Sequence, residues 1–373
     1  MSPENDSVSK NLFHETAASA SLASAEELSK TALKGIRSNP SKYRVLTGER
    51  PTGPLHIGHY FGSLKRRVEL QSLGVETWLV IADYQALTDR VGSPDLQEAV
   101  KNIVLDYLAI GLDVLSDKGV AFCHSQIPEL NQLLLPFLSL VTVSEIERNP
   151  TVKSEMESMG ITSMSGLMFN YPVHQAADIL FCHGNIVPGG RDQLPHVEIA
   201  RRIARKFNTT YCGDRPYFEE PTLLFGDAPM LLGTDGRKMG KSLKNAIFIR
   251  DDETTTAALL KKAVTDSEKR ITYEPVRRPE VSNLLLIASC CTGRTPESIA
   301  EEIGDRGGSA LKTFVTDAVN TYFSGIREKR RAYEKDPDIV RKVLARGTEI
   351  AREMAHKTIT EVHKRMFLDY GHR

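Results

Sequence analysis

Residues 43–59 read Y-R-V-L-T-G-E-R-P-T-G-P-L-H-I-G-H, and this stretch decides the fold of the chain. Val45–Thr47 is a short apolar run that is typical of a buried strand. The glycines and prolines after it predict a tight loop, and His56–His59 is where we expect a helix to begin. A strand, a glycine-rich turn and a helix start together form a geometry that binds phosphates, because the first helical N–H groups have no partner within the helix.

The two histidines of this turn are candidate phosphate donors. His56 and His59 are three residues apart, so they share one face of the expected helix. Gly58 would let a nucleotide lie against the backbone, since it has no Cβ to stand in the way. A four-residue pattern is weak evidence by itself, because two histidines can simply cap a helix. A second motif is therefore needed before the turn predicts a nucleotide site.

That second motif lies far downstream, at residues 236–242, which read G-R-K-M-G-K-S. It resembles the K-M-S-K-S loop of class I aminoacyl-tRNA synthetases, as His56–His59 resembles their H-I-G-H turn. The motifs occur in the right order, at a separation that fits a nucleotide-binding domain. The resemblance implies that Lys238 and Lys241 act with the two histidines on one triphosphate.

Composition bounds the remaining possibilities. The 373 residues can form one large or two modest domains, and the formal net charge of +0 predicts no polyanionic partner, so tRNA binding would need local basic patches. The five cysteines form no C-x-x-C pair and indicate reduced thiols in a cytoplasmic protein. No apolar run reaches membrane-spanning length. Residues 1–40 are expected to be a mobile N-terminal extension, with a short helix at Ala25–Leu33.

The order of apolar patterns predicts an α/β fold. Strands are expected at Thr77–Ala82 and Gly119–Cys123, and helical patterns alternate with them. This alternation predicts a Rossmann-like catalytic domain over residues 41–242, a parallel sheet with helices on both faces and a helical insertion at about 143–180. Strand signals are few in residues 243–373, so we expect an all-helical C-terminal domain there. The resemblance to class I synthetases implies that this domain binds the anticodon.

A second candidate site lies on the expected helix Gly166–Leu180. Asp178 lies in its most apolar part, where a buried carboxylate without a partner would be costly. It is either a solvent-facing residue of an amphipathic helix or an acceptor for a ligand N–H or O–H, and we favour the acceptor. Tyr171, Gln175 and Asp178 are spaced i, i+4, i+7 and so line one face.

A third stretch, residues 186–193, reads I-V-P-G-G-R-D-Q and predicts another strand-to-helix turn. Gly189 and Gly190 suit the close approach of a ribose or an adenine. Asp192 could accept a ribose hydroxyl, and Gln193 could bind an amino-acid substrate.

Two groups of basic residues lie on the expected C-terminal helices. A solvated helix face is the ordinary explanation for such groups, and contact with phosphates is the sharper one. The groups are Arg327, Lys329, Arg330 and Arg331, and Arg341, Lys342 and Arg346.

From Tyr43 to Arg365 the chain resembles the bacterial tryptophanyl-tRNA synthetases, with marks of a divergent second form. Residues 48–53, 83–88, 171–180 and 186–193 carry the resemblance. It implies ATP-dependent activation of L-tryptophan, transfer to the 3′ end of tRNA(Trp), and a homodimer. ATP is expected to bring Mg²⁺ with it, and the sequence predicts no metal site built by the protein.

The resemblance also implies which residues form the site. The catalytic residues would be His56, His59, Lys238 and Lys241. ATP would be bound by Arg50, Pro51, Thr52, Gly58, His59, Gly190, Arg191, Asp192, Lys238, Met239, Gly240, Lys241 and Ser242. Tryptophan would be bound by Leu46, Gly48, Gln85, Tyr171, Gln175, Asp178, Val187 and Gln193.

Three positions depart from the family pattern. Gly240 replaces the usual Ser, Gln85 stands where many bacterial relatives have His, and Gln175 stands where many have Met. Tyrosyl-tRNA synthetases have a similar Tyr–Gln–Asp face, and Asp178 could accept either an indole N–H or a phenol O–H. Tyrosine is therefore an alternative substrate. The sequence would also fit a nucleotidyltransferase of the same superfamily, or a catalytically silent, synthetase-like binding protein.

Overall fold

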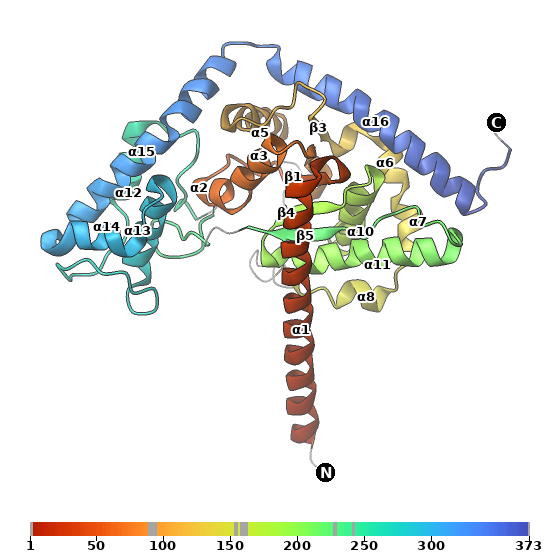
Figure 1. Cartoon of the computed structure of the whole chain (residues 1–373), viewed down its shortest axis with the longest axis horizontal. Helices are drawn as coiled ribbons and strands as arrows, with labels where there is room; N and C mark the ends of the chain where they lie inside the picture. Colours follow the sequence, from red (N-terminus) through yellow and green to blue (C-terminus); the bar gives the residue numbers. More distant parts are fainter. Residues whose placement is uncertain are drawn as a thin grey trace.

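The computed structural model describes residues 3–88, 95–152, 156, 163–226, 230–240 and 243–371, with the backbone alone for residues 3–20. A parallel sheet forms its centre (Figure 1). The strand order in this sheet is β3-β2-β1-β4-β5. The strands are β1 (Arg44–Glu49), β2 (Glu76–Ile81), β3 (Gly119–Cys123), β4 (Ile186–Gly189) and β5 (Thr222–Phe225). The expected α/β class is confirmed, and β5 is a strand that the sequence did not predict.

The strand order reverses at β1, and this reversal positions the site. The chain lays β2 and β3 on one side of β1, and then β4 and β5 on the other side. In such sheets ligands bind beyond the carboxyl ends of the strands that flank the reversal. The loop after β1 leads to His56, and the loop after β4 begins at Gly190. The fold therefore brings two turns, which are far apart in sequence, to one crevice.

Helices cover both faces of the sheet, which is why β2 and β3 are buried along almost their whole length. The short helix η1 (Pro40–Lys42) precedes β1. Among the described residues, the helical elements between the strands are α2 (Ile57–His59), the π-helical turn η2 (Tyr60–Leu64), α3 (Lys65–Ser72), α4 (Asp83–Ala86), α5 (Leu96–Ile110), η3 (His124–Gln126), α6 (Pro128–Gln132), α7 (Leu134–Leu138), α8 (Val143–Glu147), α10 (Gly166–Phe181), η4 (Arg191–Gln193) and α11 (Leu194–Tyr211).

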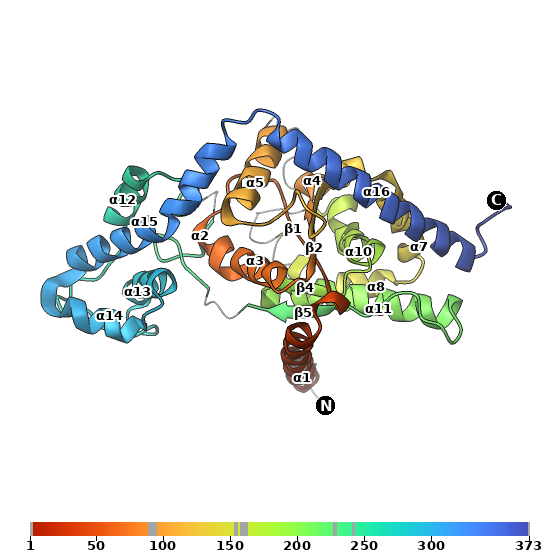
Figure 2. The same ribbon diagram turned by 45° about the horizontal axis from the view of Figure 1, so that its top comes forward.

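One edge of the sheet is covered by the N-terminal helix α1 (Pro3–Ser38), whose first half projects from the body of the protein (Figures 1 and 2). Ala25, Ala32 and Ile36 are buried, and the helix packs on β5. Ser29 Oγ accepts a hydrogen bond from the Phe225 backbone N–H at 3.1 Å. We expected a mobile extension here, but the second half of α1 is docked. The reason is that an uncovered edge strand leaves N–H groups unsatisfied.

The C-terminal region is helical, as predicted. It contains α12 (Glu253–Lys261), α13 (Pro279–Thr292), α14 (Pro296–Ile303), η5 (Gly304–Arg306), α15 (Gly307–Tyr333) and α16 (Ile339–Arg365). Its last helix, α16, turns back over the catalytic sheet (Figure 1). A Cβ on Gly347 would lie 1.8 Å from the Ala121 carbonyl oxygen in β3, so only glycine fits this contact. The domain boundary drawn at residue 243 thus separates α12–α15 from the sheet, but not α16.

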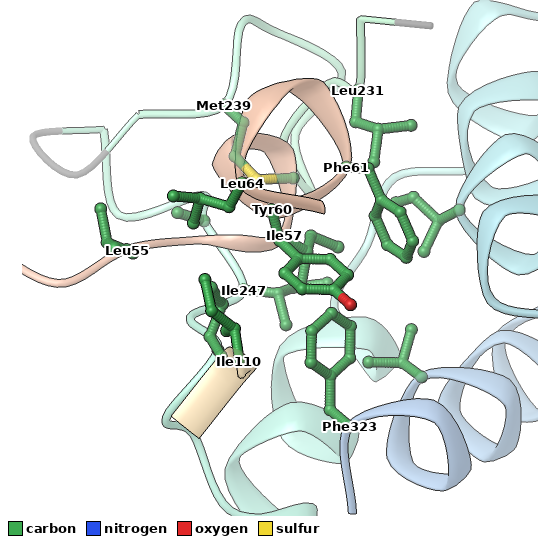
Figure 3. Packing of buried hydrophobic residues seen from close by; sticks show 14 of the residues in the cluster. Leu55, Ile57, Tyr60, Phe61, Leu64, Ile110, Leu231, Met239, Ile247 and Phe323 are labelled. Atoms are coloured by element: carbon green, nitrogen blue, oxygen red, sulfur yellow. The ribbon is translucent and has the colours of Figure 1, made fainter. Parts of the chain in front are cut away.

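An aromatic cluster joins the helical domain to the turn after β1. Tyr60 and Phe61 of η2 face Phe323 of α15, with ring centroids 5.1 and 5.9 Å from it (Figure 3). The Tyr60 and Tyr322 hydroxyls are 3.2 Å apart. Such aromatic pairs stabilise by about 0.5–1.5 kcal/mol beyond the area that they bury. The segment next to His59 is therefore anchored on the helical domain. None of the helices in the described part of the chain has the length and apolar character needed to cross a bilayer.

Candidate active site

His56 and His59 form a reciprocal cap at the start of α2. The His56 Nδ1 accepts a hydrogen bond from the His59 backbone N–H at 3.3 Å, and the His59 Nδ1 accepts one from the His56 backbone N–H at 3.1 Å. The two rings are tilted by 30°, with centroids 3.6 Å apart. Because each Nδ1 is an acceptor, the proton of each neutral ring lies on Nε2. Each imidazole can therefore donate a hydrogen bond from its Nε2–H group, and a phosphate oxygen can accept it.

The lysine loop packs against this turn. The Ile57 backbone N–H donates to the Ile247 carbonyl at 2.9 Å, and the Ile249 backbone N–H donates to the Leu55 carbonyl at 2.9 Å. Met239 is buried beside them, and its Sδ lies 3.5 Å from where a Cβ on Gly58 would be. Figure 3 shows Met239 among Leu55, Ile57 and Leu64. The two basic motifs thus meet in the tertiary structure.

The exposed part of this loop carries Lys238. Gly240, two residues further along the chain, is half-buried, and its backbone N–H is bonded to the side chain of Asn245. Lys241 and Ser242, which the sequence also places in the ATP site, lie outside the described residues. Their role therefore stays a prediction from the sequence. Arg50, Pro51 and Thr52 lie in the connection between β1 and α2, where the Thr52 backbone N–H donates to the Arg50 carbonyl at 2.8 Å.

Asn245 holds the lysine loop in shape, and sequence reasoning missed it. Its buried amide oxygen accepts from the Gly240 backbone N–H at 2.9 Å. Its amide nitrogen donates to Asp235 Oδ1 at 2.7 Å and to the Lys238 carbonyl at 3.1 Å. The hydrogen bond from Asn245 is the main cause that lowers the pKa of Asp235 to about 2. In the sequence Asn245 stands between Lys244 and the apolar run Ala246–Ile249, and that pattern does not mark it as a residue that holds the loop.

The loop after β4 packs tightly through its glycines. A Cβ on Gly190 would lie 2.5 Å from Asp192 Oδ1, and one on Gly189 would lie 3.0 Å from Gln193 Cγ. The Asp192 carboxylate accepts from the Gln193 amide at 3.0 Å. Arg191 is largely exposed and forms an ion pair with Glu26 of α1 at 3.0 Å. The N-terminal helix therefore reaches the rim of the predicted ATP site.

On the predicted face of α10, Tyr171 and Asp178 are buried and Gln175 is half-buried, so the solvent-facing alternative for Asp178 is excluded. The Tyr171 hydroxyl lies 3.3 Å from His196 Nε2, and the Gln175 amide donates to Gln193 Oε1 at 3.2 Å. Burial lowers the pKa of His196 to about 4, so its ring is neutral. These two contacts connect the face to the loop after β4 and to the helix α11 that follows it.

Asp178 has a partner that the sequence did not suggest. His124, the first residue of η3 after β3, places Nε2 2.8 Å from Asp178 Oδ1, and both side chains are buried. His174, one helical turn before Asp178, lies against the same ring, with centroids 4.6 Å apart. The spacing of His174 and Asp178 was visible in the sequence, whereas His124 comes from a different element.

Of the four other predicted tryptophan contacts, Leu46, Gln85 and Val187 are buried, and Gly48 is half-buried. Leu46 and Val187 pack in the core, and a Cβ on Gly48 would lie 2.2 Å from the Val80 carbonyl oxygen, so strand packing alone explains the glycine. Gln85 on α4 is different, because its buried Nε2 has no hydrogen-bond acceptor within the described residues. A ligand acceptor would satisfy it. The tryptophan contacts of all four stay predictions.

Comparison with known proteins agrees with this geometry. The model of the family "tRNA synthetases class I (W and Y)" matches residues 38–324. The chain belongs to the class I tRNA synthetases for tryptophan and tyrosine. The synthetase is 38% identical over 341 residues to the tryptophan–tRNA ligase of Clostridium longisporum, covering 88% of this chain and 98% of that one. It is 40% identical over 338 residues to the tryptophan–tRNA ligase of Streptococcus agalactiae serotype V, covering 87% and 98%.

A solved relative supports the same branch of the family. The synthetase resembles the tryptophanyl-tRNA synthetase from Campylobacter jejuni, which was solved in complex with ADP and tryptophan, with a TM-score of 0.74 and 31% identity. The match covers 87% of this chain and 100% of that one. The resemblance to bacterial tryptophanyl-tRNA synthetases, inferred from the motifs, is confirmed at the level of the family.

The basic cluster on α15 of the synthetase is partly internal, which corrects the phosphate interpretation for two of its members. Arg330 is buried and contacts Asp106 of α5 at 2.5 Å and Asn102 Oδ1 at 2.6 Å. Arg327 is buried and donates to Thr256 Oγ1 at 2.9 Å. Lys329 and Arg331 are exposed and remain candidates for phosphate contact.

We expect Asn245→Ala to lower the rate of adenylate formation by about 10–100-fold, because misplacing a catalytic loop by about 1 Å can cost this much. The substitution removes the three hydrogen bonds by which the Asn245 side chain joins Gly240, Lys238 and Asp235. Pyrophosphate exchange checks it. Arg237→Ala is the matched control, since it removes only an exposed ion pair with Asp235 in the same loop and should change the rate little. Equal rates for both variants would contradict the role of Asn245.

Proposed function

We propose that this synthetase activates L-tryptophan with ATP to tryptophanyl-adenylate and transfers the amino acid to tRNA(Trp). The observation that carries the proposal is the pairing of Leu55–Ile57 with Ile247–Ile249, which holds the lysine loop against the histidine turn at the carboxyl end of β1. The face of α10 formed by Tyr171, Gln175 and Asp178 is bonded to the loop after β4 through Gln175 and Gln193, and it would line the amino-acid pocket. The homology to tryptophan–tRNA ligases supports tryptophan as the amino acid.

The reaction is an in-line displacement. The tryptophan carboxylate attacks the α-phosphate of ATP, the bond to the β-phosphate breaks, and pyrophosphate leaves. The carboxylate is already ionised, so the step needs no general base. Positioning and stabilisation of charge must supply the rate, as in other phosphoryl-group chemistry. Mg²⁺ enters with the ATP phosphates, whose oxygens are the ligands that it prefers.

The histidine turn and the lysine loop have complementary parts in this step. His56 and His59, protonated at Nε2 by their mutual caps, donate to phosphate oxygens at the helix start. Lys238 supplies positive charge toward the leaving pyrophosphate, and Lys241 would add to it. Charge grows on those oxygens in the transition state, so these contacts strengthen as the bond breaks. Gly190 and Asp192 hold the nucleoside at the loop after β4.

Pyrophosphate exchange with tryptophan and tyrosine, measured side by side, tests the proposal. We expect tryptophan-dependent exchange that clearly exceeds the rate with tyrosine, because an unmatched buried acceptor costs about 1–3 kcal/mol. Exchange with tyrosine alone would show a tyrosyl-tRNA synthetase, which the Tyr–Gln–Asp face would also fit. No exchange with either amino acid would favour a catalytically silent paralogue.

We expect Asp178→Ala to raise the KM for tryptophan by about 5–150-fold, the equivalent of about 1–3 kcal/mol for a lost partner of a buried N–H. It should also weaken discrimination against analogues that lack the ring N–H, because the wild-type site leaves Asp178 without that donor when they bind. The check is kcat/KM for tryptophan and for such an analogue in both proteins. Unchanged discrimination would reduce Asp178 to a structural role.

The oligomeric state, the cellular location and the residues that contact tRNA are also proposals. We propose that the synthetase is a cytoplasmic homodimer, as the resemblance implies. The exposed side chains Lys329 and Arg331 on α15 are the described candidates for tRNA phosphate contact. On α16, Arg341 is exposed but bonded to Asp338, and Arg346 is used to hold α16 on β3. Sedimentation analysis tests the dimer.

A further inference from the structure

A buried cluster of potential metal ligands lies next to the amino-acid face. One nitrogen or oxygen atom from each of His124, His174 and Asp178 lies within 4.8 Å of the others. All three side chains are at least nine-tenths buried. His174 and Asp178 are four residues apart on α10, so they project from one helix face, while His124 follows the end of β3.

The hydrogen bonds around the cluster are incomplete. His124 Nε2 and Asp178 Oδ1 are 2.8 Å apart, close enough for an ion pair, yet without the geometry of a hydrogen bond. The other ring nitrogen of His124 and the His174 Nδ1 also have no hydrogen-bond partner within the part of the chain that is described. Buried polar groups are normally satisfied, so several unsatisfied ligand atoms within one small volume indicate an additional bound group.

The tautomer of His174 suits a metal ligand. Its Nε2 lies 2.8 Å from Asn131 Oδ1, and an amide oxygen can only accept, so the ring proton lies on Nε2. The Nδ1 lone pair is then left for a ligand bond. Metal-binding histidines typically donate their second N–H to an oxygen in this way.

We propose that His124, His174 and Asp178 bind one divalent transition-metal ion, for which Zn²⁺ is the best match. Two imidazoles and one carboxylate form a ligand set that zinc uses with a fourth, open position. The ion would fix one oxygen of Asp178 and leave the second oxygen for a substrate N–H. The site is independent of the substrate assignment, because it depends only on side chains that the fold has already brought together.

The experiment measures the metal content of the full-length protein. Protein from zinc-supplemented cells is passed through a desalting column with a weak chelator, and its zinc is measured by inductively coupled plasma mass spectrometry. We expect one ion per chain in the wild type and in the control His356→Gln, an exposed histidine on α16. We expect loss of the ion in His124→Gln and His174→Leu. Zinc retained by His174→Leu, for example on thiols, would overturn the proposal.

Two further measurements test the metal site even if the His124 or His174 variant fails to fold. Co²⁺ added to metal-depleted wild type should give visible absorption bands of a four-coordinate site, and Zn²⁺ should raise its Tm by mass action. Asn131→Leu, which removes the acceptor for His174 Nε2, should weaken metal affinity by about 10–100-fold, whereas Asn131→Asp should retain it. Wild type that takes up neither ion would show a metal-free His–Asp pair and overturn the proposal.

Discussion

His59→Ala is expected to lower the rate of adenylate formation by about 10²–10³-fold, the loss typical of one preorganised donor to a developing charge. The affinity for tryptophan should remain close to that of the wild type, because the histidine turn and the face of α10 are different parts of the site. Single-turnover formation of the adenylate and equilibrium dialysis of tryptophan check the two halves of this expectation.

The cap geometry gives this prediction a sharp control. His59 Nδ1 accepts the His56 backbone N–H at 3.1 Å, so alanine removes a helix cap as well as a phosphate donor. His59→Asn supplies a short acceptor for the same N–H, and it should keep the turn folded while recovering only part of the rate. If His59→Ala formed the adenylate at the wild-type rate, the two histidines would be a structural cap and nothing more.

Arg330→Ala is expected to destabilise the protein by about 3–5 kcal/mol, because it leaves Asp106 as an uncompensated buried charge. Asp106 is fully buried, and desolvation already raises its pKa to about 6, even though Arg330 lies 2.5 Å away. Arg330 also bonds the Asn102 side chain at 2.6 Å, so its loss would break contacts that join α15 to α5. Urea unfolding followed by circular dichroism measures the change.

The neighbouring residue provides the matched comparison. Lys329 is exposed on the same helix, and Lys329→Ala should change the free energy of unfolding by no more than about 0.5 kcal/mol. The double variant Arg330→Met with Asp106→Leu should recover most of the lost stability, since an apolar pair needs no desolvation of charge. Weakened tRNA binding by Arg330→Ala with full stability would instead restore the phosphate interpretation.

The basic cluster on α15 shows what the spacing of residues along a helix can and cannot predict. Val315, Val319 and Phe323 form a buried stripe on α15, and the same spacing continues to Arg327 and Arg330. The stripe was a signal that these two arginines face inward. We interpreted the residues by their charge, because the sequence does not show that Asp106 and Thr256 lie opposite them. Partners on other elements decide whether a basic residue is buried.

The same distinction applies to the site. The face formed by Tyr171, Gln175 and Asp178 could be predicted, because spacing along one helix fixes it. Asn245 and His124 could not, since their roles depend on bonds to Gly240 and Asp178. The short strand β5 was missed for a related reason, since four residues carry little periodic signal and pairing with β4 makes them a strand.

The sequence by itself determined the local chemistry: a strand, a turn and a helix start with two histidines at its first turn, and a polar face on one apolar helix. Backbone periodicity and capping preferences act over a few residues, so they can be inferred from a single stretch. Only the tertiary structure decided which of these stretches meet. The reversal of strand order at β1, the pairing of Leu55–Ile57 with Ile247–Ile249 and the docking of α1 and α16 on the sheet edges depend on long-range packing, in which each surface is buried only against its partner.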